Sequence, residues 1–214
     1  MKSRIKSYLV FTSRLYRLVL FVGVPIVILL LQFLLREPDY FLVALLTILG
    51  LVSAEICLDY WAFGGIAVKG GTQLEYLKSS KRGVGVVGTA LGVNMARQFL
   101  TGVLLFGVSA AITVCRGGMI ETGARWISIY TDILLLGYVL ITISLTAVRY
   151  FDGIAVNLVA VSICCLVLTG GLILIALSPY IMLAVLTVLA GVTSCLGVWL
   201  VVRRVKESYY DKAV

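Results

Sequence analysis

Long apolar runs, separated by short polar segments, follow one another along the whole chain. Hydrophobic residues fill 61% of the 214 positions and charged residues only 13%, whereas a typical soluble domain has about 45–50% and about 25%. A water-soluble fold of this length cannot bury that much apolar surface. A helix of about 20 apolar residues can cross a lipid bilayer. The sequence therefore predicts an all-α, polytopic membrane protein.

Six of these runs are long enough to span a bilayer, and short polar turns or a proline separate them. Pro25 lies inside the first run and predicts a kink there. Short loops use up the remaining residues, so the prediction is a single transmembrane domain over 1–214. The expected spans are 18–35, 40–58, 87–115, 126–148, 154–177 and 180–202.

The basic residues predict how the chain is oriented. With the N-terminus placed in the cytoplasm, 15 Lys and Arg residues fall in cytoplasmic segments and 3 in external ones, as the positive-inside rule requires. We expect a cell-membrane protein with both termini in the cytoplasm and a polar cytoplasmic tail at 203–214. The net charge of +8 is explained by this topology, and no nucleic-acid partner is expected. Segment 1–17 alternates basic and apolar residues, which predicts an amphipathic helix lying on the lipid head groups; a plain basic flank of the first span is the alternative.

The expected cytoplasmic loop 59–83 contains a helix-start pattern. Thr72 and Glu75 have the spacing of a capping box, in which both side chains bond free backbone amides at the start of a helix. Gly83, after two basic residues, is a plausible end for such a helix. Two interpretations are open: an ordinary interfacial helix, or a short rigid helix on which a cytoplasmic partner docks.

The layout as a whole resembles the permease subunits of type-2 ABC exporters. The shared features are a basic interfacial N-terminal segment, six spans, cytoplasmic termini and a short helix between spans two and three. The resemblance implies a separate cytoplasmic ATPase subunit and a homodimer or a second permease subunit as partners. One departure is that only Ser178-Pro179 separates the last two spans, where that family has two short re-entrant helices. The stretch 74–83 looks like the family's coupling helix, so the candidate ATPase-docking residues are Leu74, Glu75, Tyr76, Leu77 and Lys78.

Three charged residues lie near the predicted cytoplasmic ends of spans two and three. Glu55 and Asp59 are four residues apart and share one helix face. Arg97 occupies the neighbouring, antiparallel span. A charge inside a bilayer is costly unless it is paired, so we predict an ion pair between Arg97 and Glu55 or Asp59. It would serve either as a latch between helices or in gating and lining a polar cavity.

Asp132 is the most isolated acid, about two turns into the fourth span from the outside. An intramembrane carboxylate is a functional candidate by default, here as a contact for a cationic substrate. An ion pair with Arg125 or Arg116 near the outer head groups is an equal alternative.

No catalytic signature is present in the sequence. There is no histidine, which excludes Ser–His and Cys–His nucleophile pairs and histidine metal sites, and there is no phosphate-binding loop. We therefore expect no enzyme activity and no cofactor or metal. Two classes of function remain. The first is the membrane-spanning subunit of an ATP-driven exporter. The second is a non-enzymatic binding or assembly protein, such as a small-ligand capture subunit with an outward-facing pocket near Trp126 and Asp132.

Overall fold

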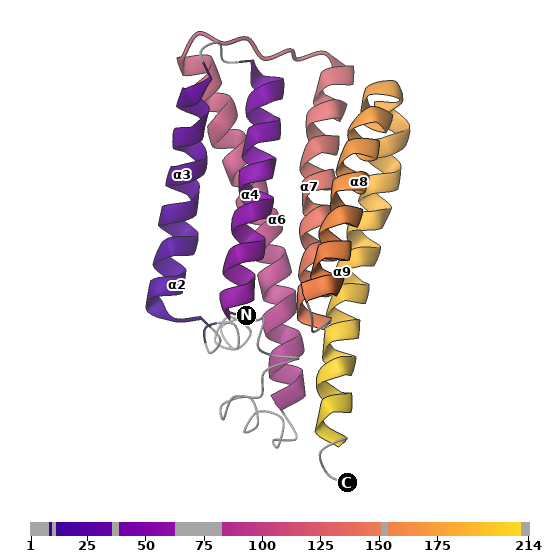
Figure 1. The fold of residues 1–214 in the computed structure, drawn as a ribbon. Helices are drawn as coiled ribbons and strands as arrows, with labels where there is room; N and C mark the ends of the chain where they lie inside the picture. The colour runs from indigo at the N-terminus through magenta and orange to yellow at the C-terminus, as the bar shows by residue number, and fades with distance from the viewer. Residues whose placement is uncertain (1–8, 10–11, 36–38, 63–82, 151–153, 211–214) are drawn as a thin grey trace.

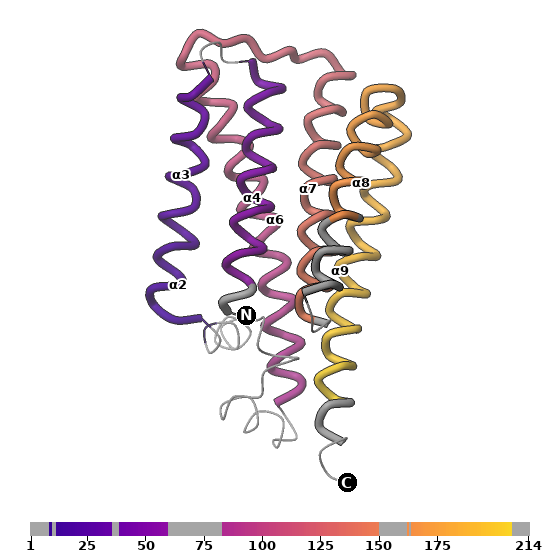
Figure 2. Tube along the Cα trace, viewed as in Figure 1, coloured from indigo at the N-terminus to yellow at the C-terminus, as the bar shows by residue number. Residues whose placement is uncertain are grey.

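The computed structural model describes residues 9, 12–35, 39–62, 83–150 and 154–210, and all regular elements among them are helical (Figures 1 and 2). The helices stand side by side in an up-and-down bundle. We call lower the end of the bundle at which α6 begins and α4 and α7 end, as in Figure 1, and upper the opposite end. The elements are α2 (Arg14–Leu18), η1 (Val19–Gly23), α3 (Val24–Leu31), η2 (Gln32–Leu34), α4 (Tyr40–Ala62), α6 (Gly83–Cys115), α7 (Ala124–Tyr150), α8 (Ile154–Leu177) and α9 (Pro179–Tyr210).

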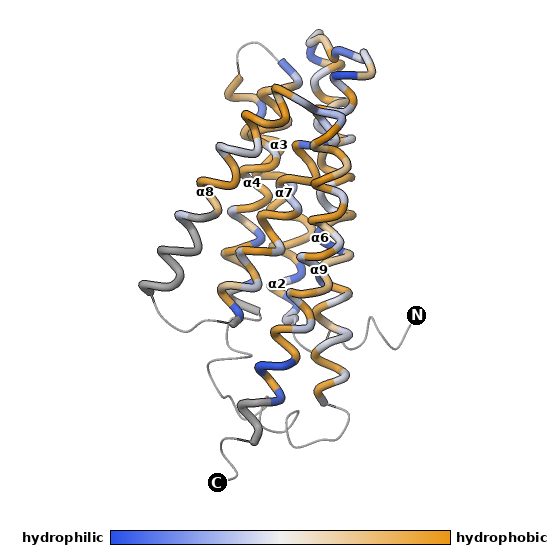
Figure 3. Tube along the Cα trace, turned by 90° about the vertical axis from the view of Figure 1, so that its right-hand side faces the viewer, coloured by the Kyte–Doolittle hydropathy of each residue, from blue (hydrophilic) through white to orange (hydrophobic). Residues whose placement is uncertain are grey.

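Five helical segments of the described chain are long and apolar enough to cross a membrane. Most positions along these helices are hydrophobic (Figure 3), and many of their large hydrophobic side chains are exposed. The prediction of an all-α fold is confirmed for the residues that the structure describes, and the helices are compatible with a multi-pass membrane protein. In α8 the described apolar stretch is Cys164–Leu177, which is shorter than a span. The five segments are Arg14–Leu34, Tyr40–Asp59, Gly83–Cys115, Ala124–Arg149 and Pro179–Lys206.

The first long helix begins earlier than predicted. Ser13 caps it, since its hydroxyl accepts a hydrogen bond from the amide of Tyr16 over 3.1 Å. Residues 14–17, assigned to the interfacial segment, therefore form the first turn of the long helix, while most of 1–13 lies outside the described residues. Pro25 is the second residue of α3, and the π-helical turn η1 directly precedes that helix. A proline lacks an N–H and its ring crowds the carbonyl four residues earlier, so a widened turn just before it relieves that contact.

Local signals in the sequence explain where the other helices begin and end. The carboxylate of Asp39 accepts from the amide of Phe41 over 3.0 Å and caps the start of α4. At the end of α6, Gly117 has a positive φ of 77°. Its amide and that of Gly118 bond the carbonyls of Val114 and Thr113 over 3.0 and 2.9 Å, which is the Schellman arrangement that favours glycine. Between α8 and α9 only Ser178 is non-helical, and Pro179 is the first residue of α9, so the break falls at the predicted Ser178-Pro179.

In three places the helices extend beyond the predicted apolar spans. The loop expected at 59–83 is helical at both ends: α4 continues to Ala62, and Gly83, expected to end a short helix, begins α6. The tail expected at 203–214 is helical to Tyr210, and α7 includes Arg149. Hydrogen bonds between successive turns carry a helix past the last apolar residue, whereas hydropathy reports only where apolar residues stop.

Helix α7 lies at the centre of the packing, against α9, α4 and α8. Its inward residues join a hydrophobic cluster with residues of all its neighbours, including Ile48, Phe106 and Ile175. Glycines permit close approaches between these helices. A Cβ atom on Gly197 of α9 would lie 2.5 Å from a hydroxyl of α7, and one on Gly137 of α7 would lie 2.7 Å from a methyl group of Ile48 in α4.

Candidate functional site

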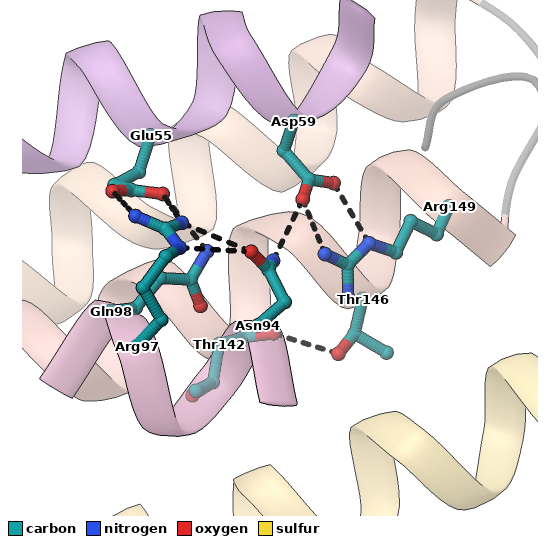
Figure 4. A network of polar contacts seen from close by, with 8 residues as sticks. All are labelled: Glu55, Asp59, Asn94, Arg97, Gln98, Thr142, Thr146 and Arg149. Carbon is teal, nitrogen blue, oxygen red and sulfur yellow. Dashed lines mark hydrogen bonds and ion pairs between the residues drawn. The ribbon is translucent and has the colours of Figure 1, made fainter. Parts of the chain in front are cut away.

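Glu55 of α4 and Arg97 of α6 form a buried ion pair near the lower end of the bundle (Figure 4). Nη1 of the guanidinium donates to Oε1 over 2.8 Å and Nη2 donates to Oε2 over 2.6 Å. Such a bidentate pairing is among the strongest that side chains make. Glu55 is 1% exposed and Arg97 is 9% exposed. The ion pair predicted between Arg97 and one acid of α4 is therefore present, with Glu55 as the partner.

Asp59, one turn further along α4, pairs with Arg149 of α7 (Figure 4). Nε of Arg149 donates to Oδ2 over 2.8 Å, and Nη2 donates to Oδ1. Both side chains are 1% exposed. Arg149 follows the predicted fourth span, in the turn before the fifth, so this contact was not predicted from the sequence. The available signal was charge balance, because two acids on one face of α4 require two cations and Arg97 supplies only one.

Asn94 connects the two ion pairs. Its Nδ2 donates to Oδ1 of Asp59 over 3.1 Å, and its Oδ1 accepts from Nε and Nη2 of Arg97 over 3.2 and 3.0 Å. Gln98 donates from Nε2 to Oε2 of Glu55 over 3.1 Å. Positions 94, 97 and 98 share one face of α6 because they are three and four residues apart. The network holds two positive and two negative formal charges, so it carries no net charge.

This network joins the lower parts of three helices. Its acids lie in the last part of α4, its amides and one arginine in α6, and Arg149 in the last turn of α7. None of its charged side chains lines the cavity or the groove described below. Between the two predicted roles, this burial favours a latch over a cavity lining, since a paired and desolvated charge resists separation from its partner.

Asp132 of α7 is in the opposite situation. It is 0% exposed, and neither carboxylate oxygen has a hydrogen-bond partner among the described residues. The predicted pairing with Arg125 or Arg116 does not form. Arg125 donates instead to a backbone carbonyl of α8 over 3.2 Å, and Arg116 donates to two backbone carbonyls at the end of the first long helix over 2.8 and 2.9 Å. A buried carboxyl without a donor is costly when charged, so Asp132 stays a functional candidate.

A neutral polar cluster near the upper end was missed by the sequence analysis. Gln32 of η2 donates to Oγ of Ser109 in α6 over 2.5 Å and to Oγ1 of Thr47 in α4 over 3.3 Å. All three side chains are buried. The only signal was a glutamine inside an apolar run, and serine and threonine in helices bond their own backbone so often that the partners could not be chosen.

The described chain has two notable hollows. A cavity of about 310 Å³ lies between the upper parts of α4, α7 and α8, and a groove of about 880 Å³ lies between the lower parts of α6 and α9. Trp126 lines the cavity, as the capture hypothesis expected, whereas Asp132 is not among its lining residues. Glycines of α6 line much of the groove, which ends at Lys206 of α9.

The candidate ATPase-docking residues 74–78 lie outside the described residues, so the docking interpretation stays a prediction. The chain matches no protein-family model, and neither curated proteins nor solved structures gave a match.

Proposed function

We propose that the protein is the membrane-spanning subunit of an ATP-driven exporter whose ATPase is a separate chain. In this proposal α2 to η2 make the first of six spans, α8 makes the fifth, and both termini lie in the cytoplasm. The lower end of the bundle then faces the cytoplasm, which is where most of the basic residues fall. A homodimer, or a pair with a second permease subunit, completes the pathway.

The observation that carries the proposal is that the ion-pair network joins α4 and α6, the two helices that segment 63–82 connects in the sequence. This segment connects the lower end of α4 to the lower end of α6, and it includes the predicted docking residues. Glu55, Arg97 and Asn94 tie these two helices together in the lower half of the bundle, and Arg149 adds α7. A push on the segment from an ATPase would therefore reach three helices together.

Expression and purification of the tagged chain from its native membrane provide the test of this proposal. We expect an ATPase subunit to co-purify and to hydrolyse ATP. Tyr76→Ala and Leu77→Ala should remove that hydrolysis or its coupling, with insertion unchanged. Glu121→Ala, at the far end of the bundle, is the matched control and should have no effect. Purification without any ATPase activity, or equal activity in all variants, would overturn the proposal.

Topology is tested separately by labelling in intact cells. Met119 lies in the upper connection between α6 and α7 and is 87% exposed. In a variant without the five native cysteines, Met119→Cys should react with a membrane-impermeant maleimide from outside. Lys206→Cys, at the lower end of α9, should react only after the cells are opened. The reverse pattern contradicts the proposed orientation.

The capture subunit remains a second candidate, and one observation favours it. A cavity lies beside Trp126, near the upper end of the bundle, where that hypothesis requires a ligand pocket. The two candidates separate on the ATPase test, because a passive capture protein has no hydrolysis to couple and Tyr76→Ala would change nothing.

A further inference from the structure

The cavity near the upper end of the bundle has apolar walls. Ile129 and Ile133 line it from α7 and Ile175 lines it from α8, and all three are buried. From Arg125 at its rim to Ile133 is eight residues of helix, which corresponds to a depth of about 12 Å at 1.5 Å per residue. The complete lining is Phe41, Arg125, Trp126, Ile129, Ile133, Leu172, Ile175 and Ala176.

Among the described residues that line the cavity, Arg125 is the one charged residue. Its Nη2 donates to the carbonyl of Ala176 over 3.2 Å, which fixes the guanidinium between α7 and α8. A guanidinium has five N–H donors, so this bond leaves several available at an exposed position. No carboxylate of the described residues forms an ion pair with it.

The cavity rim is stiffened by aromatic contacts. The ring of Trp126 lies edge-on to that of Phe41, with centroids 6.3 Å apart, and 6.0 Å from that of Tyr130. Tyr130 in turn packs edge-on against Tyr40 at 4.7 Å. Such packing links the upper ends of α4 and α7 and keeps the opening formed in the absence of a ligand.

We propose that this cavity binds a single-chain anionic amphiphile, with its carboxylate or phosphate on Arg125 and its apolar chain along Ile129 and Ile133. The charge of Arg125 selects the anionic group, and its planar donors suit the paired oxygens of a carboxylate or phosphate. A volume of about 310 Å³ is at the lower end of small-molecule sites and accommodates one chain. The ligand is either a free amphiphile or one acyl chain of an anionic membrane lipid.

Fluorescence of Trp126 provides the test. Trp61→Phe and Trp199→Phe leave Trp126 as the single tryptophan of the chain. The protein is placed in phosphatidylcholine nanodiscs and titrated with 11-bromoundecanoate, whose bromine quenches tryptophan on contact. We expect saturable quenching that unbrominated undecanoate reverses. The neutral 11-bromoundecanol should bind at least about tenfold more weakly, since a tenfold loss corresponds to one charge-assisted contact of about 1.4 kcal/mol.

Variants of the cavity separate specific binding from partition into the bilayer. Arg125→Gln should weaken undecanoate at least about tenfold and leave the alcohol unchanged. Ala176→Phe fills the cavity and should abolish saturable binding of both brominated compounds. Ile133→Trp should do the same; because it adds a second tryptophan, its binding is measured by competition with unbrominated undecanoate. Arg116→Gln, at the same end but outside the cavity, is the matched control and should bind normally. Quenching that does not saturate, or that is the same in all variants, overturns the proposal.

The two sources of ligand are distinguished by the lipid. If a lipid chain occupies the cavity, phosphatidylglycerol with brominated acyl chains should quench Trp126 in the discs, and Arg125→Gln should reduce this quenching. If only the free acid binds, phosphatidylglycerol should neither quench specifically nor compete. Specific quenching by neither compound refutes the inference. No ATPase takes part in these measurements. A negative result for ligand binding would therefore not contradict the exporter proposal, and a negative ATPase test would not contradict ligand binding in the cavity.

Discussion

The lower ion-pair network and the lone carboxyl of Asp132 are both buried charges, but their surroundings are opposite. Asp59 is 1% exposed and accepts hydrogen bonds from Arg149 and from Asn94. Asp132 is 0% exposed and has no hydrogen-bond partner among the described residues. Both acids lie on helices of the same bundle, so the difference is one of partners and not of burial.

This difference separates two kinds of buried charge. In the network each charge has an opposite partner, and removing a partner leaves the other charge stranded in an apolar interior, which is strongly destabilising. At Asp132 no such partner exists in the described structure, so the carboxyl contributes burial cost without a compensating bond. The network therefore holds the helices together. Asp132, in the upper half of α7, is the buried acid that is available to bind a ligand or a proton.

The largest expected effect is that of removing Arg149. Among the described residues, Arg149→Met leaves the amide of Asn94 as the one hydrogen-bond donor to Asp59, and we expect the free energy of unfolding to fall by about 3–5 kcal/mol. The measurement is reversible unfolding in mixed micelles. The double variant Asp59→Leu with Arg149→Met should recover most of the loss, because no charge is then stranded. Arg14→Met, at an exposed position of α2, is the control. A double variant as unstable as the single one would contradict this account.

The contrast also shows what sequence could and could not predict. Hydropathy located the helical runs, and the four-residue spacing of Glu55 and Asp59 predicted a shared face and an arginine partner. The sequence did not predict that Arg149 lies inside the bundle. A basic residue after an apolar run is typical of a polar segment outside the membrane as well as of the last turn of a helix. The sequence could not place Gln32 either, since its bonds to α4 and α6 depend on how three helices pack. Such tertiary pairings leave no local pattern.

Asn94 should be the next most sensitive position. Asn94→Leu removes one hydrogen bond to Asp59 and two from Arg97 while both ion pairs stay in place. Hydrogen bonds to charged groups are worth about 1.5–3 kcal/mol, and we expect a loss of unfolding free energy in that range. The same unfolding assay provides the measurement. A loss as large as that of Arg149→Met would mean that Asn94, and not the ion pairs, holds the three helices together.

Asp132 should respond in the opposite direction. Asp132→Leu removes a buried carboxyl that has no partner in the described structure, and we expect the free energy of unfolding to rise by about 1–3 kcal/mol. Asp132→Asn keeps the shape of the side chain and its need for hydrogen-bond partners, so it should give little of this gain in unfolding free energy. If Asp132→Leu instead destabilises the protein, the carboxyl has a stabilising partner, and the contrast with the network is lost.

Gln98 combines both situations in one side chain, and it should show the smallest effect. Its Nε2 donates to Oε2 of Glu55 over 3.1 Å, whereas its own buried carbonyl oxygen has no partner among the described residues. Gln98→Leu therefore loses a charge-assisted hydrogen bond and at the same time removes an unsatisfied acceptor. Each of these is worth about 1–3 kcal/mol, and they act in opposite directions, so the net change should stay within about 1 kcal/mol.

Gln98→Glu provides the sharper comparison, because it places a second carboxylate beside Glu55 and should destabilise the protein as pH rises through its ionisation. A large loss in Gln98→Leu would mean that the hydrogen bond to Glu55 outweighs the orphaned oxygen and that the network extends further along α6 than its two ion pairs.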